Sequence, residues 1–324
     1  MIYFLVVGGF FLLLAGAEIM LRGAVGLTEK FGISKLVVGM TVVAFGTSAP
    51  ELLVSLNATL SGSSGLAIGN IVGSNVANIL LILGVAGLLM PIASEPGTLK
   101  RDGWMLLLGT GLFMALTYRD EIDLIGGLIL LAYFIGFLVY SYRREKQGVD
   151  AAGEMYEHKV DDVEGVPHNL LKIMIFLALG FAGLIYGAEK LVEGGVAIAR
   201  TFGVSETVIG LTMIAFGTSL PELAASVVAA LRKHANVAVG VVVGSNIFNI
   251  VGIIGVVAVI TPMEVPSRVV NFDIWIMAAA TLILMPFMIG RRERLGRFKA
   301  FLFLAAYLIY IATIGYGVET LIPA

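Results

Sequence analysis

Two glutamates stand in apolar stretches of the chain where a charged residue is costly. Glu51 lies in the run TVVAFGTSAPELLVSL and is the only charged residue between Lys35 and Glu95. Glu222 lies in a related run, LTMIAFGTSLPELAAS. A carboxylate at the centre of a membrane span costs about 3 kcal/mol to insert, and such residues usually serve a function. Neither run contains a Lys, Arg or His that could neutralise its glutamate, so a structural ion pair is disfavoured.

Small polar residues occur in two sets in each half, one just before the glutamate and one further along the chain, and within each set the spacing of three or four places the side chains on a shared helix face. They are Thr47, Ser48, Ser74 and Asn78 in the first half, and Thr218, Ser219, Ser245 and Asn249 in the second. Their oxygens are hard donors, which suit calcium, magnesium, sodium or potassium rather than zinc or copper. Two carboxylates balance one divalent cation or two monovalent cations. The sequence therefore indicates a cation site.

Two prolines should interrupt the helices that carry these groups. Pro50 and Pro221 lack a backbone N–H and disfavour a continuous helix through the preceding turn. We expect a broken helix near mid-membrane, in which the carbonyls of Ala44 and Ala215 lose their helical hydrogen-bond donors. A carbonyl without a donor is costly in lipid unless it lines a cavity or binds a ligand, so we expect both carbonyls to face the site.

Some of the polar residues have an equally good structural interpretation. Asn70, Asn75 and Asn246 could be interhelical hydrogen-bonding residues, which are common in membrane bundles. Thr47 and Thr218 could bond back to their own helices.

The two glutamate runs belong to a longer internal duplication. The segment that starts at Gly39 aligns without a gap to the segment that starts at Gly210, and nearly half of the positions are identical. The offset of 171 residues relates Glu51 to Glu222 and Asn75 to Asn246. Matched polar residues over such a length indicate duplication rather than shared apolar composition.

The composition predicts a polytopic membrane protein with an all-α fold. Of the 324 residues, 58% are hydrophobic and only 14% are charged, whereas soluble chains carry about 25% charged residues. The net charge of −2 gives no indication of nucleic-acid binding, and the absence of cysteine excludes disulfides and thiolate metal sites. Since a span needs about 20 apolar residues, we expect ten helices, at 2–21, 36–60, 66–90, 103–118, 122–142, 169–194, 205–231, 236–261, 271–289 and 298–318.

Five helices in each repeat place the second copy in the membrane in the opposite sense. The expected units are an N-terminal repeat (1–142), a cytoplasmic linker (143–168) and an inverted C-terminal repeat (169–324). With both termini outside, all but four of the 21 Lys and Arg fall on the cytoplasmic side, as the positive-inside rule requires. The four exceptions are Arg119, Lys190, Arg200 and Arg268. Glu18 and Glu189 are expected near helix ends, each with a neighbouring base (Arg22 or Lys190).

The paired motifs GTSAPE with GSNVAN, and GTSLPE with GSNIFN, resemble the two α-repeats of the sodium/calcium exchanger family. The resemblance covers essentially the whole chain. It implies a cell-membrane antiporter, not an enzyme, that exchanges sodium for calcium by alternating access. It implies no cofactor beyond the transported ions, and movement of the first and sixth helices. The liganding positions that it implies are Thr47, Ser48, Glu51, Ser74, Asn78, Thr218, Ser219, Glu222, Ser245 and Asn249, with the carbonyls of Ala44 and Ala215.

The chain departs from some potassium-dependent relatives, which carry aspartate where this chain has Asn249, so potassium co-transport is disfavoured. Three other functions remain open at this stage. A proton/calcium exchanger of similar fold is the nearest. A passive cation channel is more remote, as is an intramembrane hydrolase with Ser48 or Ser219 as nucleophile, because the histidines lie in predicted loops and a nucleophile needs a positioned base.

Overall fold

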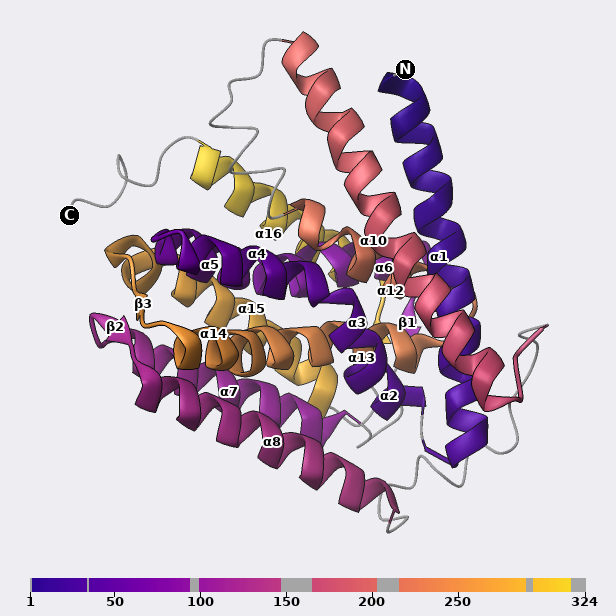
Figure 1. The fold of residues 1–324 in the computed structure, drawn as a ribbon, viewed down its shortest axis with the longest axis horizontal. Helices are drawn as coiled ribbons and strands as arrows, with labels where there is room; N and C mark the ends of the chain where they lie inside the picture. The colour runs from indigo at the N-terminus through magenta and orange to yellow at the C-terminus, as the bar shows by residue number, and fades with distance from the viewer. Residues whose placement is uncertain are drawn as a thin grey trace.

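The computed structural model describes residues 2–33, 35–93, 99–146, 165–202, 216–289 and 294–315. The described chain is mainly helical (Figure 1). The elements of the first half are α1 (Ile2–Phe31), α2 (Lys35–Val38), η1 (Gly39–Val43), α3 (Ala44–Thr47), α4 (Ala49–Leu60), α5 (Ser64–Val76), η2 (Ala77–Ile82), α6 (Leu83–Leu89), β1 (Ile92–Ala93), α7 (Lys100–Thr117), β2 (Glu121–Ile122) and α8 (Leu124–Lys146). Here η marks a π-helical segment.

The second half repeats this order where the structure describes it, except that a π-helical segment, η4, precedes α15. Its elements are α10 (Leu170–Thr201), α12 (Leu220–Leu231), α13 (Ala235–Ile247), η3 (Phe248–Ile253), α14 (Ile254–Ile260), β3 (Met263–Glu264), η4 (Val269–Asp273), α15 (Ile274–Ile289), β4 (Arg294–Leu295) and α16 (Arg297–Gly315). The π-helical segments η2 and η3 lie at equivalent positions of the two repeats. π-Helical turns inside α-helices are frequent at functional sites.

The described residues contain seven helical runs that are long and apolar enough to cross a membrane, or eight if the bent pair Gly39–Thr47 and Ala49–Leu60 forms one span. The helix α7, with 18 residues, is not among them, and part of the expected span 205–231 lies outside the described residues. The structure is that of a multi-pass membrane protein, and the count of ten spans stays a prediction.

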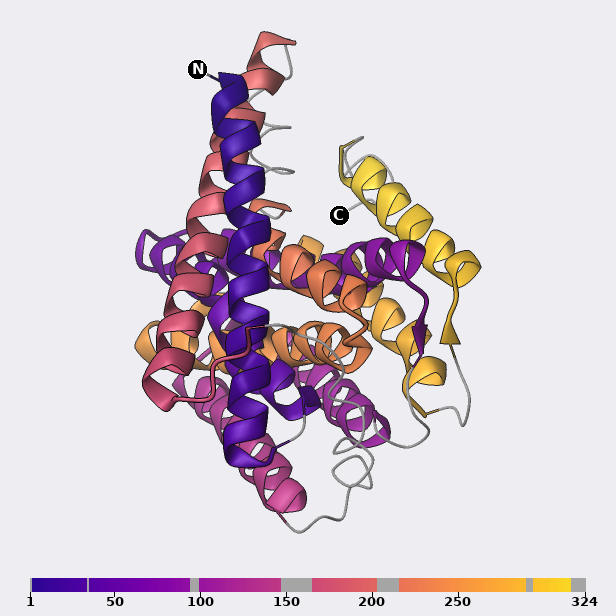
Figure 2. The ribbon, with the colours of Figure 1, turned by 90° about the vertical axis from the view of Figure 1, so that its right-hand side faces the viewer.

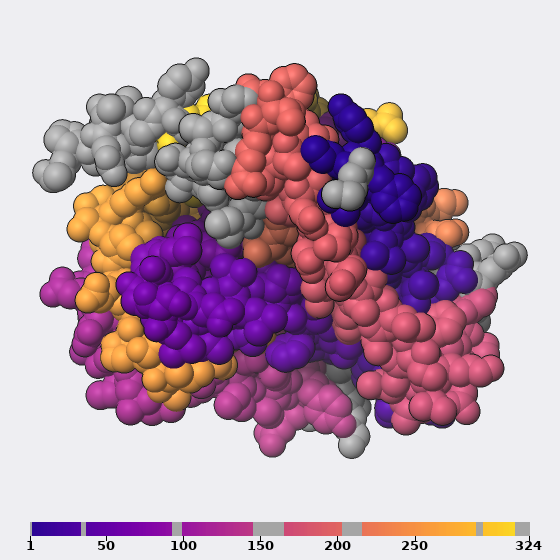
Figure 3. Space-filling model, turned by 45° about the horizontal axis from the view of Figure 1, so that its top comes forward, coloured from indigo at the N-terminus to yellow at the C-terminus, as the bar shows by residue number. Residues whose placement is uncertain are grey.

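The helices α1 and α10 form an antiparallel pair along one flank of the molecule (Figures 1 and 2). Gly9 of α1 lies against Leu191, whereas Gly23 lies against Leu177, so the partner number falls as the α1 number rises. Glycine permits this close approach: a Cβ at Gly16 would lie 2.6 Å from the backbone nitrogen of Leu184. Small residues at membrane helix interfaces allow such contact between backbones. Figure 3 shows α1 and α10 on the surface, beside the α4–α5 region.

Helices and strands of the two halves exchange equivalent contacts. The helix α8 packs against α14, and its counterpart α16 packs against α6. Two short antiparallel sheets repeat the exchange, because β1 pairs with β4 and β2 pairs with β3. The buried core between them consists mainly of α5, η2, α6, α13, η3 and α14, and the central positions of this core hold the polar residues of both repeats.

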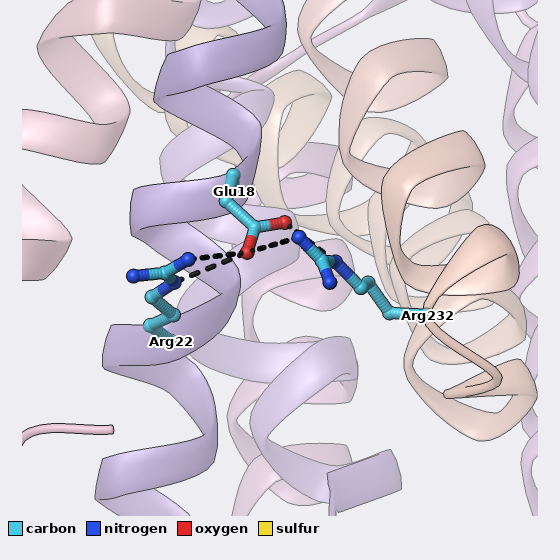
Figure 4. A network of polar contacts seen from close by, with 3 residues as sticks. All are labelled: Glu18, Arg22 and Arg232. Carbon is cyan, nitrogen blue, oxygen red and sulfur yellow. Dashed lines mark hydrogen bonds and ion pairs between the residues drawn. The ribbon is translucent and has the colours of Figure 1, made fainter. Parts of the chain in front are cut away.

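The charges in α1 and α10 do not end these helices, contrary to the sequence-based expectation. The helix α1 continues to Phe31, well beyond Glu18, and α10 continues to Thr201, beyond Glu189. The expected neighbouring bases are present, since Arg22 lies 2.9 Å from Glu18 and Lys190 lies 3.2 Å from Glu189. Glu18 also accepts two hydrogen bonds from Arg232, at 3.0 and 2.9 Å (Figure 4). Glu18 therefore has one partner in its own helix and a second in the other repeat.

Candidate functional site

The helix that carries Glu51 is broken directly before the glutamate. The helix α3 ends at Thr47, Ser48 leaves the helical conformation with ψ of 10°, and α4 begins at Ala49. The segments on either side are bent by 49°. Pro50 occupies the first turn of α4, where the missing N–H costs no hydrogen bond. The predicted break is therefore confirmed in the first repeat.

The second repeat has the same geometry at its equivalent position. Ser219 has ψ of 1°, and α12 begins at Leu220 with Pro221 and Glu222 in its first turn. Both glutamates thus lie at helix N-termini, where the helix dipole and the unpaired N–H groups stabilise negative charge. Each carboxylate is fully buried, with no exposed surface.

The two carboxylates are neighbours across the repeats and repel each other electrostatically. The hydroxyl of Ser48 donates a 2.8 Å hydrogen bond to Oε1 of Glu222, which links the break in the first repeat to the carboxylate of the second. Thr218 lies close to the carboxylate of Glu51, and Thr47 and Ser245 lie close to that of Glu222. Six of the sequence-predicted residues, three from each half, therefore lie together.

Many polar atoms of the sequence-predicted ligands are buried without a hydrogen-bond partner in the described part of the chain. A buried polar group without a partner costs about 1–3 kcal/mol, so such atoms are rare in folded proteins unless they serve a ligand. The atoms are Glu51 Oε1 and Oε2, Glu222 Oε2, Ser74 Oγ, Ser219 Oγ, Ser245 Oγ, Asn78 Oδ1 and Asn249 Oδ1. All eight are oxygens of residues that the sequence selects as ligands, and two oxygens outside this set, Asn70 Oδ1 and Ser141 Oγ, are buried in the same way.

The carbonyl of Ala44 differs from the sequence-based expectation. It accepts hydrogen bonds from the Ser48 N–H at 3.0 Å and from the Thr47 hydroxyl at 3.2 Å, so it is not freed by Pro50. The reason is helical register: a proline removes the donor to the carbonyl four residues before it, which is Gly46. Thr47 therefore does bond back to its own helix. The equivalent residue Ala215 lies outside the described residues.

The donor set has the chemistry of a site for a hard cation. Two carboxylates supply a charge of −2, and hydroxyl and amide oxygens supply neutral donors, which suits calcium or alkali ions. In the described ranges no group of three or more His, Cys, Asp or Glu side chains comes together. The charge of the site thus comes from one carboxylate per repeat, and its remaining donors come from neutral side chains.

Asn75 and Asn246 are further members of this region that the sequence left between two interpretations. Both are buried. The amide of Asn75 bonds to that of Asn249, and the amide of Asn246 bonds to that of Asn78, so both contacts cross between the repeats. The sequence signal that could identify them is their exact duplication: Asn70, the third candidate, aligns with Val241 and has no counterpart.

Known proteins of similar sequence and structure include a putative antiporter and sodium/calcium exchangers. The chain is 36% identical over 304 residues to a putative antiporter, CaxA, of Alkalimonas amylolytica, covering 93% of this chain and 95% of that protein. It is 32% identical to the sodium/calcium exchanger MaX1 of Methanosarcina acetivorans, covering 95% and 97%. A solved structure of the sodium-calcium exchanger NCX_Mj superposes with a TM-score of 0.81 at 31% identity, covering 95% of this chain and 97% of that one.

The sequence profile of the family described as sodium/calcium exchanger protein matches residues 1–143 and 172–316, which include both copies of the duplicated segment. This family consists of membrane transporters rather than enzymes, and its members carry cations. Together with the duplicated glutamates at their helix breaks, this match shows that the chain belongs to the sodium/calcium exchanger family.

Proposed function

We propose that the protein exchanges sodium for calcium across the cell membrane, at one central site built around Glu51 and Glu222. The observation that carries this proposal is the pair of buried carboxylates, one from each repeat, together with buried oxygens of the expected ligands that have no hydrogen-bond partner among the described residues. The names of MaX1 and NCX_Mj, both sodium/calcium exchangers, support the choice of ions.

The ligands of the calcium ion would be oxygens from both repeats. The carboxylates of Glu51 and Glu222 supply the charge, and Ser48, Thr47, Ser74 and Asn78 supply neutral oxygens together with Thr218, Ser219, Ser245 and Asn249. Calcium takes six to eight oxygens, so this set is large enough for one ion. The carbonyl of Ala44 already accepts two hydrogen bonds here, and it joins only if the helix break rearranges.

Sodium and calcium compete for the same carboxylates, and this competition couples their transport. A calcium ion must leave before sodium ions can bind the two carboxylates, and the sodium ions must leave before calcium can bind. An empty site would carry two buried charges without a counter-ion, so its passage between the two sides is disfavoured. Exchange, rather than leak, follows from this electrostatic cost, and alternating access of one site to either side provides the route.

The two repeats, residues 1–142 and 169–324, are proposed to be inverted, with ten spans in total and a cytoplasmic linker at 143–168. Three features support this: the antiparallel α1–α10 pair, the exchanged packing of α8 with α14 and of α16 with α6, and the exchanged sheets. Cysteines placed at Gly148 and Ala324 should label from opposite sides of the membrane. Labelling of both from one side would exclude the inverted ten-span arrangement.

The ion coupling is tested by calcium uptake into proteoliposomes loaded with sodium, potassium, choline or acidic buffer. Uptake is expected only with internal sodium. Uptake driven by a pH gradient without sodium would assign proton/calcium exchange instead, and uptake that is independent of the internal cation would assign a channel.

A further inference from the structure

Four asparagines join the two repeats beside the carboxylates. The amide nitrogen of Asn78 donates to Oδ1 of Asn246 at 3.0 Å, and the amide nitrogen of Asn249 donates to Oδ1 of Asn75 at 3.1 Å. Asn75 and Asn246 each donate to the other's backbone carbonyl, at 3.2 and 3.4 Å. These four contacts obey the internal duplication, since each has its counterpart in the other repeat, whereas a further contact of the Asn75 amide nitrogen with Met277 Sδ at 3.8 Å is made by Asn75 alone in the described network.

The backbone carbonyls determine which way each amide points. A carbonyl oxygen can only accept, so the amide of Asn75 must turn its nitrogen toward the carbonyl of Asn246. The amide oxygen of Asn75 then faces Asn249, so Asn249 must donate a hydrogen bond from its amide nitrogen. The same reasoning runs from the carbonyl of Asn75 through Asn246 to Asn78. The orientation of all four amides is therefore determined by hydrogen bonding, although an amide on its own could face either way.

The outer amides are left with their oxygens unpaired. Asn78 and Asn249 are completely buried, and in the described part of the chain their Oδ1 atoms have no hydrogen-bond partner. Each follows a serine by one helical turn, Ser74 or Ser245, whose hydroxyl oxygen is also unpaired. The Glu222 helix α12 contacts η2, which carries Asn78, and the Glu51 helix α4 contacts η3, which carries Asn249. These helix contacts agree with the ligand role proposed above for the two free amide oxygens.

We propose that Asn75 and Asn246 are positioning residues that hold the amides of Asn78 and Asn249 with their oxygens toward the transported cation. This inference deepens the proposed function and rests on it. An aspartate would present oxygen whichever way it turned, whereas an asparagine presents oxygen only when its amide is held. A reversed amide would offer N–H groups, which repel a cation. The inner pair therefore lets neutral side chains act as dependable ligands in this chain.

The proposal predicts a coupling between the inner and outer residues that a double-mutant cycle measures. Two comparisons are made with purified full-length protein. The Asn75→Leu variant is compared with the wild type, and the double variant Asn75→Leu with Asn249→Asp is compared with the single variant Asn249→Asp. The readouts are the half-saturating calcium concentration for exchange and the calcium-induced rise in melting temperature. With Asn249 present, Asn75→Leu should raise the half-saturating calcium concentration about tenfold. The reason is that the loss of a hydrogen bond that orients a ligand of a charged ion lowers the binding free energy by about the amount that corresponds to a tenfold change in affinity.

In the Asn249→Asp background the same change should have little effect, because the carboxylate needs no orientation. An equal loss in both backgrounds would overturn the proposal and make Asn75 a packing residue. The mirror cycle, Asn246→Leu with Asn78→Asp, carries the same test if Asn75→Leu does not fold. Asn70→Leu is the matched control: this buried amide contacts Ser55 at 3.5 Å, and its loss should leave the calcium dependence unchanged.

The wild-type protein separates failure of this inference from failure of the proposed function. If calcium neither exchanges nor raises the melting temperature of the wild type, the proposed function fails. The same double-mutant cycle is then measured as the sodium-induced rise in melting temperature, which we expect to depend on the same amide oxygens. If the wild type responds to calcium and both backgrounds lose affinity equally, only the positioning role fails.

Discussion

The hydroxyl of Ser48 binds Oε1 of Glu222 at 2.8 Å, while the mirrored hydroxyl of Ser219 makes no such contact with Glu51. In the described residues, Ser219 Oγ and both carboxylate oxygens of Glu51 have no hydrogen-bond partner. The two repeats are therefore equivalent in sequence but not in this conformation. One glutamate is held by the other repeat, and the other glutamate presents both oxygens to the site.

This asymmetry predicts unequal effects of two otherwise equivalent substitutions. Ser48→Ala should lower the free energy of unfolding by about 2 kcal/mol without added cations, because it removes a buried hydrogen bond to a charged group. Ser219→Ala, the matched control, removes a hydroxyl without a partner and should be close to neutral. Thermal unfolding of both variants in chelator measures the difference, and equal destabilisation would show that the Ser48 contact contributes nothing.

The α1–α10 pair should be sensitive to side-chain volume at its glycines. A Cβ at Gly187 would lie 2.5 Å from the backbone nitrogen of Leu13, so Gly187→Val should destabilise the protein by about 1–3 kcal/mol through overpacking. A Cβ at Gly8 would meet nothing within 4 Å, which makes Gly8→Val the control with the same change in helix propensity. A melting temperature that falls equally in both variants would contradict the close packing.

The ion pairs of Glu18 should contribute little to stability in spite of their geometry. Arg232 is 48% exposed and Glu18 is 20% exposed, and such partly solvated pairs are worth roughly 0–1 kcal/mol. Arg232→Gln should lower the melting temperature slightly, and the difference should shrink at high salt as screening increases. Lys233→Gln, in the same loop, is the control. A large loss that is independent of salt would mean that Arg232 acts through packing rather than charge.

The residues around Glu51 were enough to predict the helix break at the candidate site. Glu51 follows Thr47 and Ser48 by one helical turn, and the proline before it predicts the break that the structure contains. The duplication then predicts the same arrangement at Glu222. These inferences depend only on local periodicity, which a single sequence contains.

Other features depend on contacts between residues far apart in the chain, and local patterns do not contain them. The partner of Glu18 in mid-helix, Arg232, is 214 positions away, so the length of α1 was underestimated. The direction of the Asn249 amide depends on a carbonyl in the other repeat. The error at Ala44 had a different origin, since counting four residues back from Pro50 gives Gly46.

The carboxylates themselves provide the most direct test of the proposed site, through equilibrium binding of radioactive calcium to purified wild type, Glu51→Gln and Glu222→Gln. Glutamine keeps the shape of the side chain but removes one charge, and neutral oxygens alone do not repay the dehydration of a divalent ion. The wild type should bind one calcium ion per chain that sodium displaces, and both variants should lose this binding while they melt no lower than the wild type in chelator. Glu189→Gln, an exposed carboxylate outside the site, should bind as the wild type does. Normal, sodium-sensitive calcium binding by Glu51→Gln or Glu222→Gln would contradict a site built on the two glutamates.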